Sequence, residues 1–103
     1  MITLDSSAAL DADVTSTGAV SVTVAGALQV SGSIGTNLTT VTTGSGSTTT
    51  FGDTTVGNSL VVTSPGAVST AAGDVLMVHG MGTTTPNKRV TVNGVNDVAI
   101  PVQ

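Results

Sequence analysis

The chain has 103 residues, enough for one small domain, and carries a formal net charge of −4. Lys88 and Arg89 are its only bases and it has no cysteine, which excludes a basic nucleic-acid interface, disulfides, thiolate metal sites and a cysteine nucleophile. Aromatic residues make up 1% of the chain, so a core must be built from Val, Ala, Leu and Ile. The many β-branched Val and Thr residues and the absence of Glu favour an all-β fold.

Neither a membrane span nor a signal peptide is expected. The longest apolar run, Val75–Val78, is far shorter than the roughly 20 residues that cross a bilayer. The first residues, "MITLDSSAALDADV", lack the basic start and the apolar stretch of a signal peptide. This fits a chain that is not exported by that route, or a mature or excised segment.

The clearest pattern in the first third of the chain is an alternation of period two. In "GAVSVTVAGALQVSG", Val20, Val22 and Val24 fall on one face, and Leu28 and Val30 continue the alternation after a glycine. This pattern is typical of half-buried strands.

The segment from Leu38 to Gly52, "LTTVTTGSGSTTTFG", has the composition of a linker but contains Phe51, the only aromatic residue. We expect two strands around a "GSGS" corner, with Leu38 pointing inward and Phe51 in the core. The competing interpretation is a long flexible loop.

A hairpin is expected near the C-terminus, because Asn93-Gly94 lies between apolar-alternating segments. A two-residue turn would place Val90 opposite Asp97. A three-residue loop, Asn93–Val95, would place Val90 opposite Val98, and we favour this register because it pairs two apolar residues.

Together these patterns predict ten or so short strands and no helix. Related Gly-Ala-aliphatic motifs recur at irregular spacing, at Gly18–Ser21, Gly26–Gln29 and Gly66–Ser69. Such a degenerate repeat of one strand-and-turn unit favours a β-solenoid; a β-sandwich is the alternative. We expect one all-β domain, with a repeat-like part over residues 1–73 and C-terminal strands with an antiparallel hairpin over residues 74–103.

The stretches "ITLDSSAALDADVTSTGAVSVTVAGALQVSGSI" and "TTTFGDTTVGNSLVVTSPGAVSTAAG" resemble the passenger repeats of filamentous-haemagglutinin-type and autotransporter adhesins. The resemblance covers roughly Ile2–Gly73 and lies in rhythm and composition. Those repeats form right-handed parallel β-helices, so the resemblance implies a β-helical fold and a place at a cell surface.

No residue pattern points to catalysis. His79 is the only histidine, and Asp74, five residues earlier, would lie on the opposite face of a strand. There is no G-x-S-x-G motif and no second histidine for a metal site. We therefore expect a chain that is not an enzyme and needs no cofactor.

Asp11 and Asp13, with Asp5 nearby, form a weak D-x-D pattern. A calcium loop would need Gly at the sixth position and Glu at the twelfth, where Ser16 and Val22 stand. We interpret these aspartates as solvated acids.

Thr-x-Thr pairs occur at residues 40 and 42, 48 and 50, and 83 and 85. A regular threonine array could bind ice, but the pairs lack a fixed period. We interpret them as strand-forming residues on the solvent face. Lys88-Arg89 is interpreted as a solvated strand start that could pair with an Asp of a neighbouring subunit.

These observations predict a non-enzymatic structural protein that assembles with copies of itself. The candidate assembly residues are Ile2 and Leu4 at one end of the chain and Ile100 and Val102 at the other, where Pro101 marks an edge strand. Two settings compete: an extracellular or cell-surface adhesive or filament-forming β-solenoid, and a virion component such as a capsid decoration or tail protein. A third hypothesis, a small binding module or enzyme, has no site in the sequence to support it. Both settings imply a homo-oligomer or polymer, within a larger surface or capsid assembly, with no nucleic-acid partner.

His79→Ala tests the non-enzymatic interpretation. We expect the variant to keep the assembled form and any measurable activity, because no acid–base partner accompanies this histidine. Sedimentation and hydrolase or transferase assays of both proteins provide the measurement. Loss of an activity with the fold preserved would overturn the interpretation.

Overall fold

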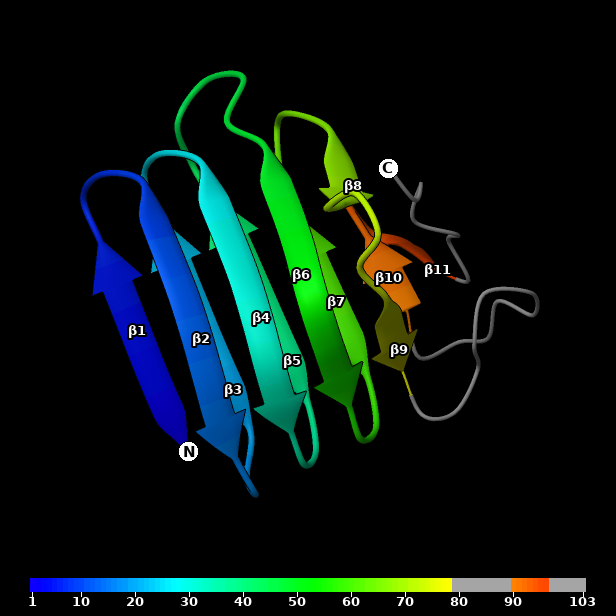
Figure 1. The fold of residues 1–103 in the computed structure, drawn as a ribbon. Helices are drawn as coiled ribbons and strands as arrows, with labels where there is room; N and C mark the ends of the chain where they lie inside the picture. Colours follow the sequence, from blue (N-terminus) through cyan, green and yellow to red (C-terminus); the bar gives the residue numbers. More distant parts are fainter. Residues whose placement is uncertain (79–89, 97–103) are drawn as a thin grey trace.

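The computed structural model describes residues 1–78 and 90–96. Every regular element in these two ranges is a β-strand. None of the described residues forms a helix long and apolar enough to cross a membrane. Two sheets face each other (Figure 1). Sheet A consists, in spatial order, of β1 (Ile2–Ser6), β3 (Val20–Val24), β5 (Leu38–Thr42), β7 (Leu60–Thr63), β10 (Val90–Val92) and β11 (Val95–Asn96). Sheet B consists of β2 (Leu10–Ser16), β4 (Leu28–Ile34), β6 (Thr49–Val56) and, both pairing with β6, β8 (Val68–Thr70) and β9 (Leu76–Val78).

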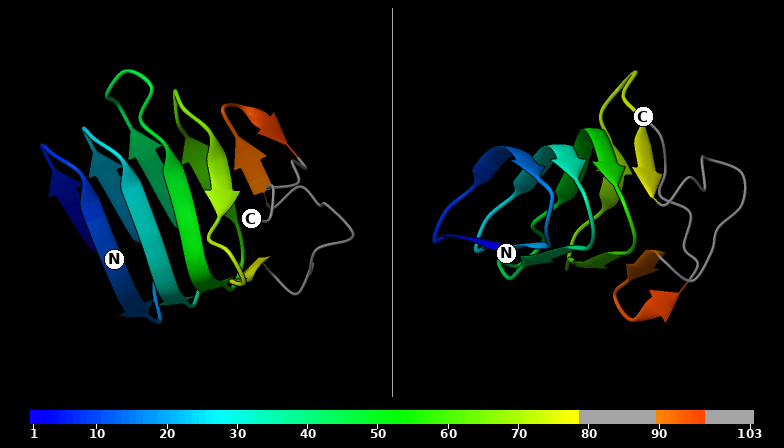
Figure 2. Two further views of the ribbon diagram at one scale, coloured as in Figure 1. Left: turned by 45° about the horizontal axis from the view of Figure 1, so that its top comes forward. Right: turned by 90° about the horizontal axis from the view of Figure 1, so that it is seen from below.

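As far as β8 the chain alternates between the two sheets, and strands of the same sheet in successive turns pair in parallel. The result is a short β-solenoid of about four turns, in which the sheets form opposite walls (Figure 2). This confirms the all-β prediction and decides for the solenoid over the sandwich. The stacking continues beyond Gly73, because β9 pairs with β6 and β10 with β7.

The first turns have a constant length. Ile2 pairs with Val20 and Val20 with Leu38, a step of 18 residues each time. The third turn is longer: Leu28 pairs with Thr49, a step of 21 residues. The extra residues lie in the corner at 43–48, where the N–H of Ser47 donates to the carbonyl of Gly44 at 3.0 Å. The segment from Leu38 to Gly52 is therefore a folded wall with an enlarged corner, as predicted.

A bulge lengthens the same turn by one more residue. Val30 pairs with Phe51 but Gly32 pairs with Thr54, so β6 carries one unmatched residue there. Gly32 has a φ of 124°, and a side chain on it would overlap the carbonyl oxygen of Val14 in the turn below. Glycine alone adopts this backbone conformation readily and leaves room for the Val14 carbonyl, so the close approach of β4 to β2 here depends on Gly32.

The core is the column of inward-facing side chains between the two walls. Leu38 and Phe51 are both 0% exposed, which confirms the prediction for each. Val20, Val22 and Val24 are also buried, so the period-two pattern identified the inner face of this strand.

The third turn places threonines in this column. Thr40, Thr42 and Thr49 are each at most 2% exposed. The expectation that the 40 and 42 pair faces solvent is therefore wrong; both point into the core because they alternate in phase with Leu38 on β5. The hydroxyl of Thr42 donates to Oγ of Ser64 at 3.1 Å, whereas those of Thr40 and Thr49 have no hydrogen-bond partner.

The C-terminal hairpin is present, but the expected three-residue loop over Asn93–Val95 is wrong. Val92 pairs with Val95, so Asn93 and Gly94 alone form the turn. Their φ angles, 49° and 81°, are both left-handed, as the two-residue turn of an Asn-Gly hairpin requires. Val98, the expected partner of Val90, and Pro101 lie outside the described residues.

Side-chain hydrogen bonds join this hairpin turn to Ser64, which directly follows β7. Nδ2 of Asn93 donates to the carbonyl of Ser64 at 2.9 Å, and its Oδ1 accepts from the N–H of Ser64 at 2.7 Å. The backbone N–H of Asn93 donates to the carbonyl of Val62 at 2.7 Å. Asn93 thus forms hydrogen bonds with Ser64 and Val62 while it adopts a left-handed backbone conformation, which Asn tolerates well.

Phe51→Ala tests the importance of the aromatic core residue. We expect the free energy of unfolding to fall by roughly 3–5 kcal/mol, because a fully buried ring is removed and a cavity remains. Urea unfolding followed by circular dichroism measures the change. Val61→Thr on β7 is the control: Val61 is 37% exposed, and we expect a change within about 0.5 kcal/mol. Equal stability of the Phe51 variant and the unchanged protein would contradict the prediction.

Thr40→Val should stabilise the fold. The substitution keeps the β-branched shape and removes a buried hydroxyl without a partner, so we expect the free energy of unfolding to rise by about 1–3 kcal/mol. Thr42→Val is the matched control and should destabilise, because it removes the hydrogen bond to Ser64. Urea unfolding of both variants is the measurement, and a Thr40 variant less stable than the unchanged protein would refute the assignment.

Candidate functional site

The N-terminal end of the solenoid is open. Within the described part of the chain, β1 pairs with β3 alone and β2 with β4 alone, so both walls begin on a free edge (Figures 1 and 2). Ile2 and Leu4, two of the predicted assembly residues, lie on β1 at this edge. The other two, Ile100 and Val102, lie outside the described residues.

The free edge of β1 carries unpaired backbone groups. Residues of a parallel strand bond alternately to the neighbours on either side. The N–H of Ile2 donates to the carbonyl of Ala19 at 3.0 Å, so the even-numbered residues of β1 bond β3. The N–H and C=O groups of Thr3 and Asp5 consequently point toward the open side.

The same alternation holds on β2. The N–H of Leu10 donates to the carbonyl of Ala27 at 3.0 Å, so the backbone groups of Asp11, Asp13 and Thr15 point toward the open side. The two walls together therefore present five residues whose main chain is ready to bond another strand.

Between these edges the core itself is accessible. A recess of about 520 Å³ opens between β1 and β2. Its apolar lining residues are Ile2, Leu4, Leu10, Ala12 and Val14. Ile2 is 36% exposed, whereas Val20, which occupies the same position one turn later, is 2% exposed. The difference arises because no turn within residues 1–78 and 90–96 covers Ile2. Burial of this apolar surface would be stabilising.

Three carboxylates surround the open end. Asp5, Asp11 and Asp13 are exposed on the outer faces of β1 and β2. One turn later their positions are occupied by the uncharged residues Thr23, Gln29 and Ser31. The sequence shows that three aspartates lie close together in the chain. The strand pairing shows in addition that all three lie in the first turn of the solenoid, beside its open edge.

Asp5, Asp11 and Asp13 are not grouped as the ligands of one metal ion. Within residues 1–78 and 90–96, no three His, Cys, Asp or Glu side chains are grouped as ligands of one ion. Asp11 and Asp13 alternate along one strand with Ala12 between them and point outward, toward solvent.

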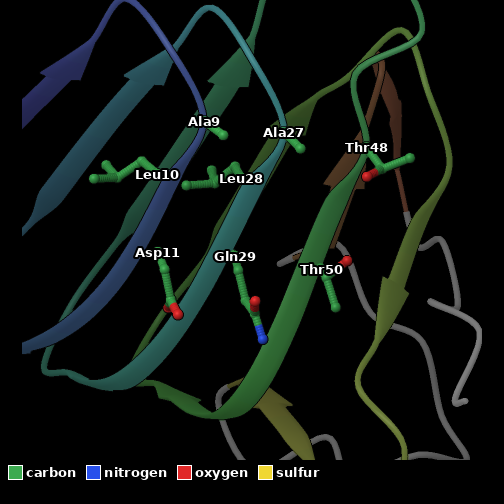
Figure 3. A pocket seen from close by; sticks show the side chains of 8 residues that line it. All are labelled: Ala9, Leu10, Asp11, Ala27, Leu28, Gln29, Thr48 and Thr50. Carbon is green, nitrogen blue, oxygen red and sulfur yellow. The ribbon is translucent and has the colours of Figure 1, made fainter.

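A second depression, of about 490 Å³, lies on sheet B. Asp11, Gln29 and Thr50 form a row on its outer face, beside Ala9 and Ala27 (Figure 3). Among its described lining residues, Asp11 is the one titratable group. The row offers a carboxylate, an amide and a hydroxyl at successive turns, without a second acid or a base for proton transfer.

The far end of sheet B also exposes apolar side chains. β8 and β9 pair with β6 and with no other described strand. Val75 is 49% exposed and Met77 is 40% exposed. His79 follows β9 directly and lies outside the described residues. The open N-terminal end, with its free strand edges and accessible apolar side chains, is therefore the candidate site.

Comparison with known proteins adds no family. The chain matches no protein-family model, none of the curated proteins and no solved structure.

Proposed function

We propose that this chain is a non-enzymatic structural protein that assembles with copies of itself, as a surface or extracellular adhesive or filament-forming β-solenoid. The open N-terminal end supports this most directly, since it combines two free strand edges with an accessible apolar core. A self-associating solenoid covers both at once, through main-chain hydrogen bonds and burial.

The composition supports the same function. Natural proteins often block free strand edges with charged side chains, above all lysine, with bulges or with proline; β1 and β2 contain no lysine and no proline, and their charged residues are three aspartates. The resemblance of Ile2–Gly73 to adhesin passenger repeats favours a location at a cell surface.

A virion component, such as a capsid decoration or tail protein, is the alternative. One feature favours it: among the described strands of sheet A, β11 alone runs antiparallel to its neighbour, β10. A short solenoid with differently built ends suits a protein that attaches to a larger shell through one end.

Thr15→Pro tests assembly through the open edge. The N–H of Thr15 points away from β4, so proline removes a donor for an added strand without removing a hydrogen bond within the chain. We expect the variant to keep its β circular dichroism and to sediment as a smaller species than the unchanged protein. Thr15→Val, which keeps the N–H, is the matched control and should assemble normally.

Two results would contradict this proposal. The first is a full chain that sediments as a monomer at high concentration. The second is a Thr15→Pro variant that assembles as well as Thr15→Val does.

A further inference from the structure

We infer that residues 98–102 of one copy form a strand on the free edge of β2 in a second copy, parallel to it, with Val98, Ile100 and Val102 over the apolar recess. This inference rests on the proposed self-assembly and identifies the segment that fills the open end. Residues 97–103 lie outside the described residues. The inference is carried by their sequence, by the open edge of β2 and by the direction of β11.

The last six residues, "VAIPVQ", have the composition that the recess requires. Val98, Ile100 and Val102 alternate with Ala99 and Pro101. No side chain of the segment is charged. It can therefore lie beside the aspartates of the first turn without the like-charge repulsion that two N-terminal ends would meet.

The recess offers space at the middle of β2. Ala12 lines it, on the inner face of the strand, and the recess measures about 520 Å³. In the next turns Ala12 pairs with Val30, and Val30 with Phe51, so Ala12 is the smallest side chain of its column. A branched aliphatic side chain such as Ile100 can fill the space above it.

Backbone alternation decides which residues of the segment bond β2. Ile2, on the inner face of β1, donates its N–H to the carbonyl of Ala19 in the next turn at 3.0 Å. By the same alternation, the inward residues of a parallel strand placed before β2 bond β2. The apolar, even-numbered residues of the segment take these positions. Pro101 belongs to the other phase, so its missing N–H removes no bond to β2.

The phase of β11 leads to the same assignment. The N–H of Asn93 donates to the carbonyl of Val62 on β7 at 2.7 Å, so the backbone groups of Val92 face β11 and pair with those of Val95. The backbone groups of Asn96 consequently face away from β10. In a strand that continues β11, every even-numbered residue has its N–H and C=O on this free side, where a second copy can approach.

The direction of β11 gives the second copy room. Strands of sheet B run opposite to β1, β3, β5 and β7 of sheet A (Figure 1). β10 is parallel to β7 and β11 is antiparallel to β10, so β11 has the direction of β2. A second copy in the same orientation can therefore continue sheet A of the first copy with its own sheet B. No strand of the second copy then falls where β10 lies, and β8 and β9 of the first copy stay outside the contact.

The segment must come from a second copy, because the first turn of its own chain is out of reach. β11 lies five strand spacings from β1 in sheet A, which is about 24 Å. Asn96 ends β11, and the chain from Asn96 to Ile100 spans at most about 14 Å.

The expected register places Ile100 opposite Ala12, so that Val102 lies opposite Val14. In parallel pairing the N–H of Thr15 then donates to the carbonyl of Val102. Thr15→Pro removes this hydrogen bond, so the register agrees with the effect expected of that variant on assembly.

Single cysteines test the register, because the chain has no cysteine of its own. Ala99 is expected opposite Asp11, and neighbouring strands are about 4.8 Å apart, within the Cα separation of a disulfide. We expect a mixture of Ala99→Cys and Asp11→Cys to form a disulfide-linked dimer under mild oxidation, and each variant alone to form none above background. Gln29→Cys is the matched control, since it is exposed in the same column one turn later, where β2 already occupies the edge. It should not crosslink with Ala99→Cys.

Serine at two adjacent positions tests which face of the segment is buried. We expect Ile100→Ser to sediment as a smaller species than the unchanged protein, because it withdraws apolar surface from the recess. Ala99→Ser is the matched control and should assemble like the unchanged protein, because this residue faces outward in the proposed strand. Circular dichroism of both variants should show the unchanged β signal.

Sedimentation of the same samples separates the failures. Assembly without a crosslink between Ala99→Cys and Asp11→Cys would overturn this inference and leave the proposed self-assembly standing. A crosslink of Ala99→Cys to Thr3→Cys on β1, or equal assembly of the two serine variants, would do the same. A full chain that remains monomeric would refute the proposed function, and this inference with it.

Discussion

The parallel hydrogen-bond ladder is the constraint on which the rest of this structure depends. Successive turns must stay about 4.8 Å apart along both walls, so each paired strand residue lies directly over an equivalent residue of the turn before. A change in turn length can then be absorbed only where the ladder is interrupted. The third turn does this in two places, the corner at 43–48 and the bulge beside Gly32.

Local features of the sequence predicted most of the architecture. The alternation of a strand is visible in consecutive residues, so the strands that contain Val22 and Leu38 could be identified without knowing which strands they pair with. The prediction that Phe51 is buried succeeded for a similar reason, because a single large apolar side chain has few other stable environments.

Features that depend on pairing could not be predicted in this way. The 18-residue turn was hidden because Gly-Ala-aliphatic motifs precede strands of both walls: the motif at Gly18 leads into sheet A and that at Gly26 into sheet B. The spacing between two such motifs is therefore sometimes half a turn and sometimes one or more whole turns, and no single period is visible. For the hairpin, the sequence prediction gave more weight to pairing Val90 with Val98 than to the backbone preference of Asn93-Gly94. In the structure the Asn93-Gly94 turn determines the register.

The inner threonines and the acidic end illustrate the same limit at the level of side chains. Thr40 is strand-forming and polar, so its composition alone suggests the solvent face, whereas its phase relative to Leu38 places it inside. Likewise, Asp5, Asp11 and Asp13 could be seen as acids but not as the border of a stack. Carboxylates repeated in the same column would face one another in successive turns, and the second turn carries neutral residues at these positions instead.

The constant length of the first turns has a consequence for how such a chain can change over generations. Gain or loss of one residue within a wall would reverse which side chains face the core from that point to the next corner. Gain or loss of a complete turn, such as residues 20–37, would return every later residue to the same wall and the same phase. Heritable variation in the length of this protein is therefore expected to come in whole turns, with smaller differences confined to corners such as the one around Gly46.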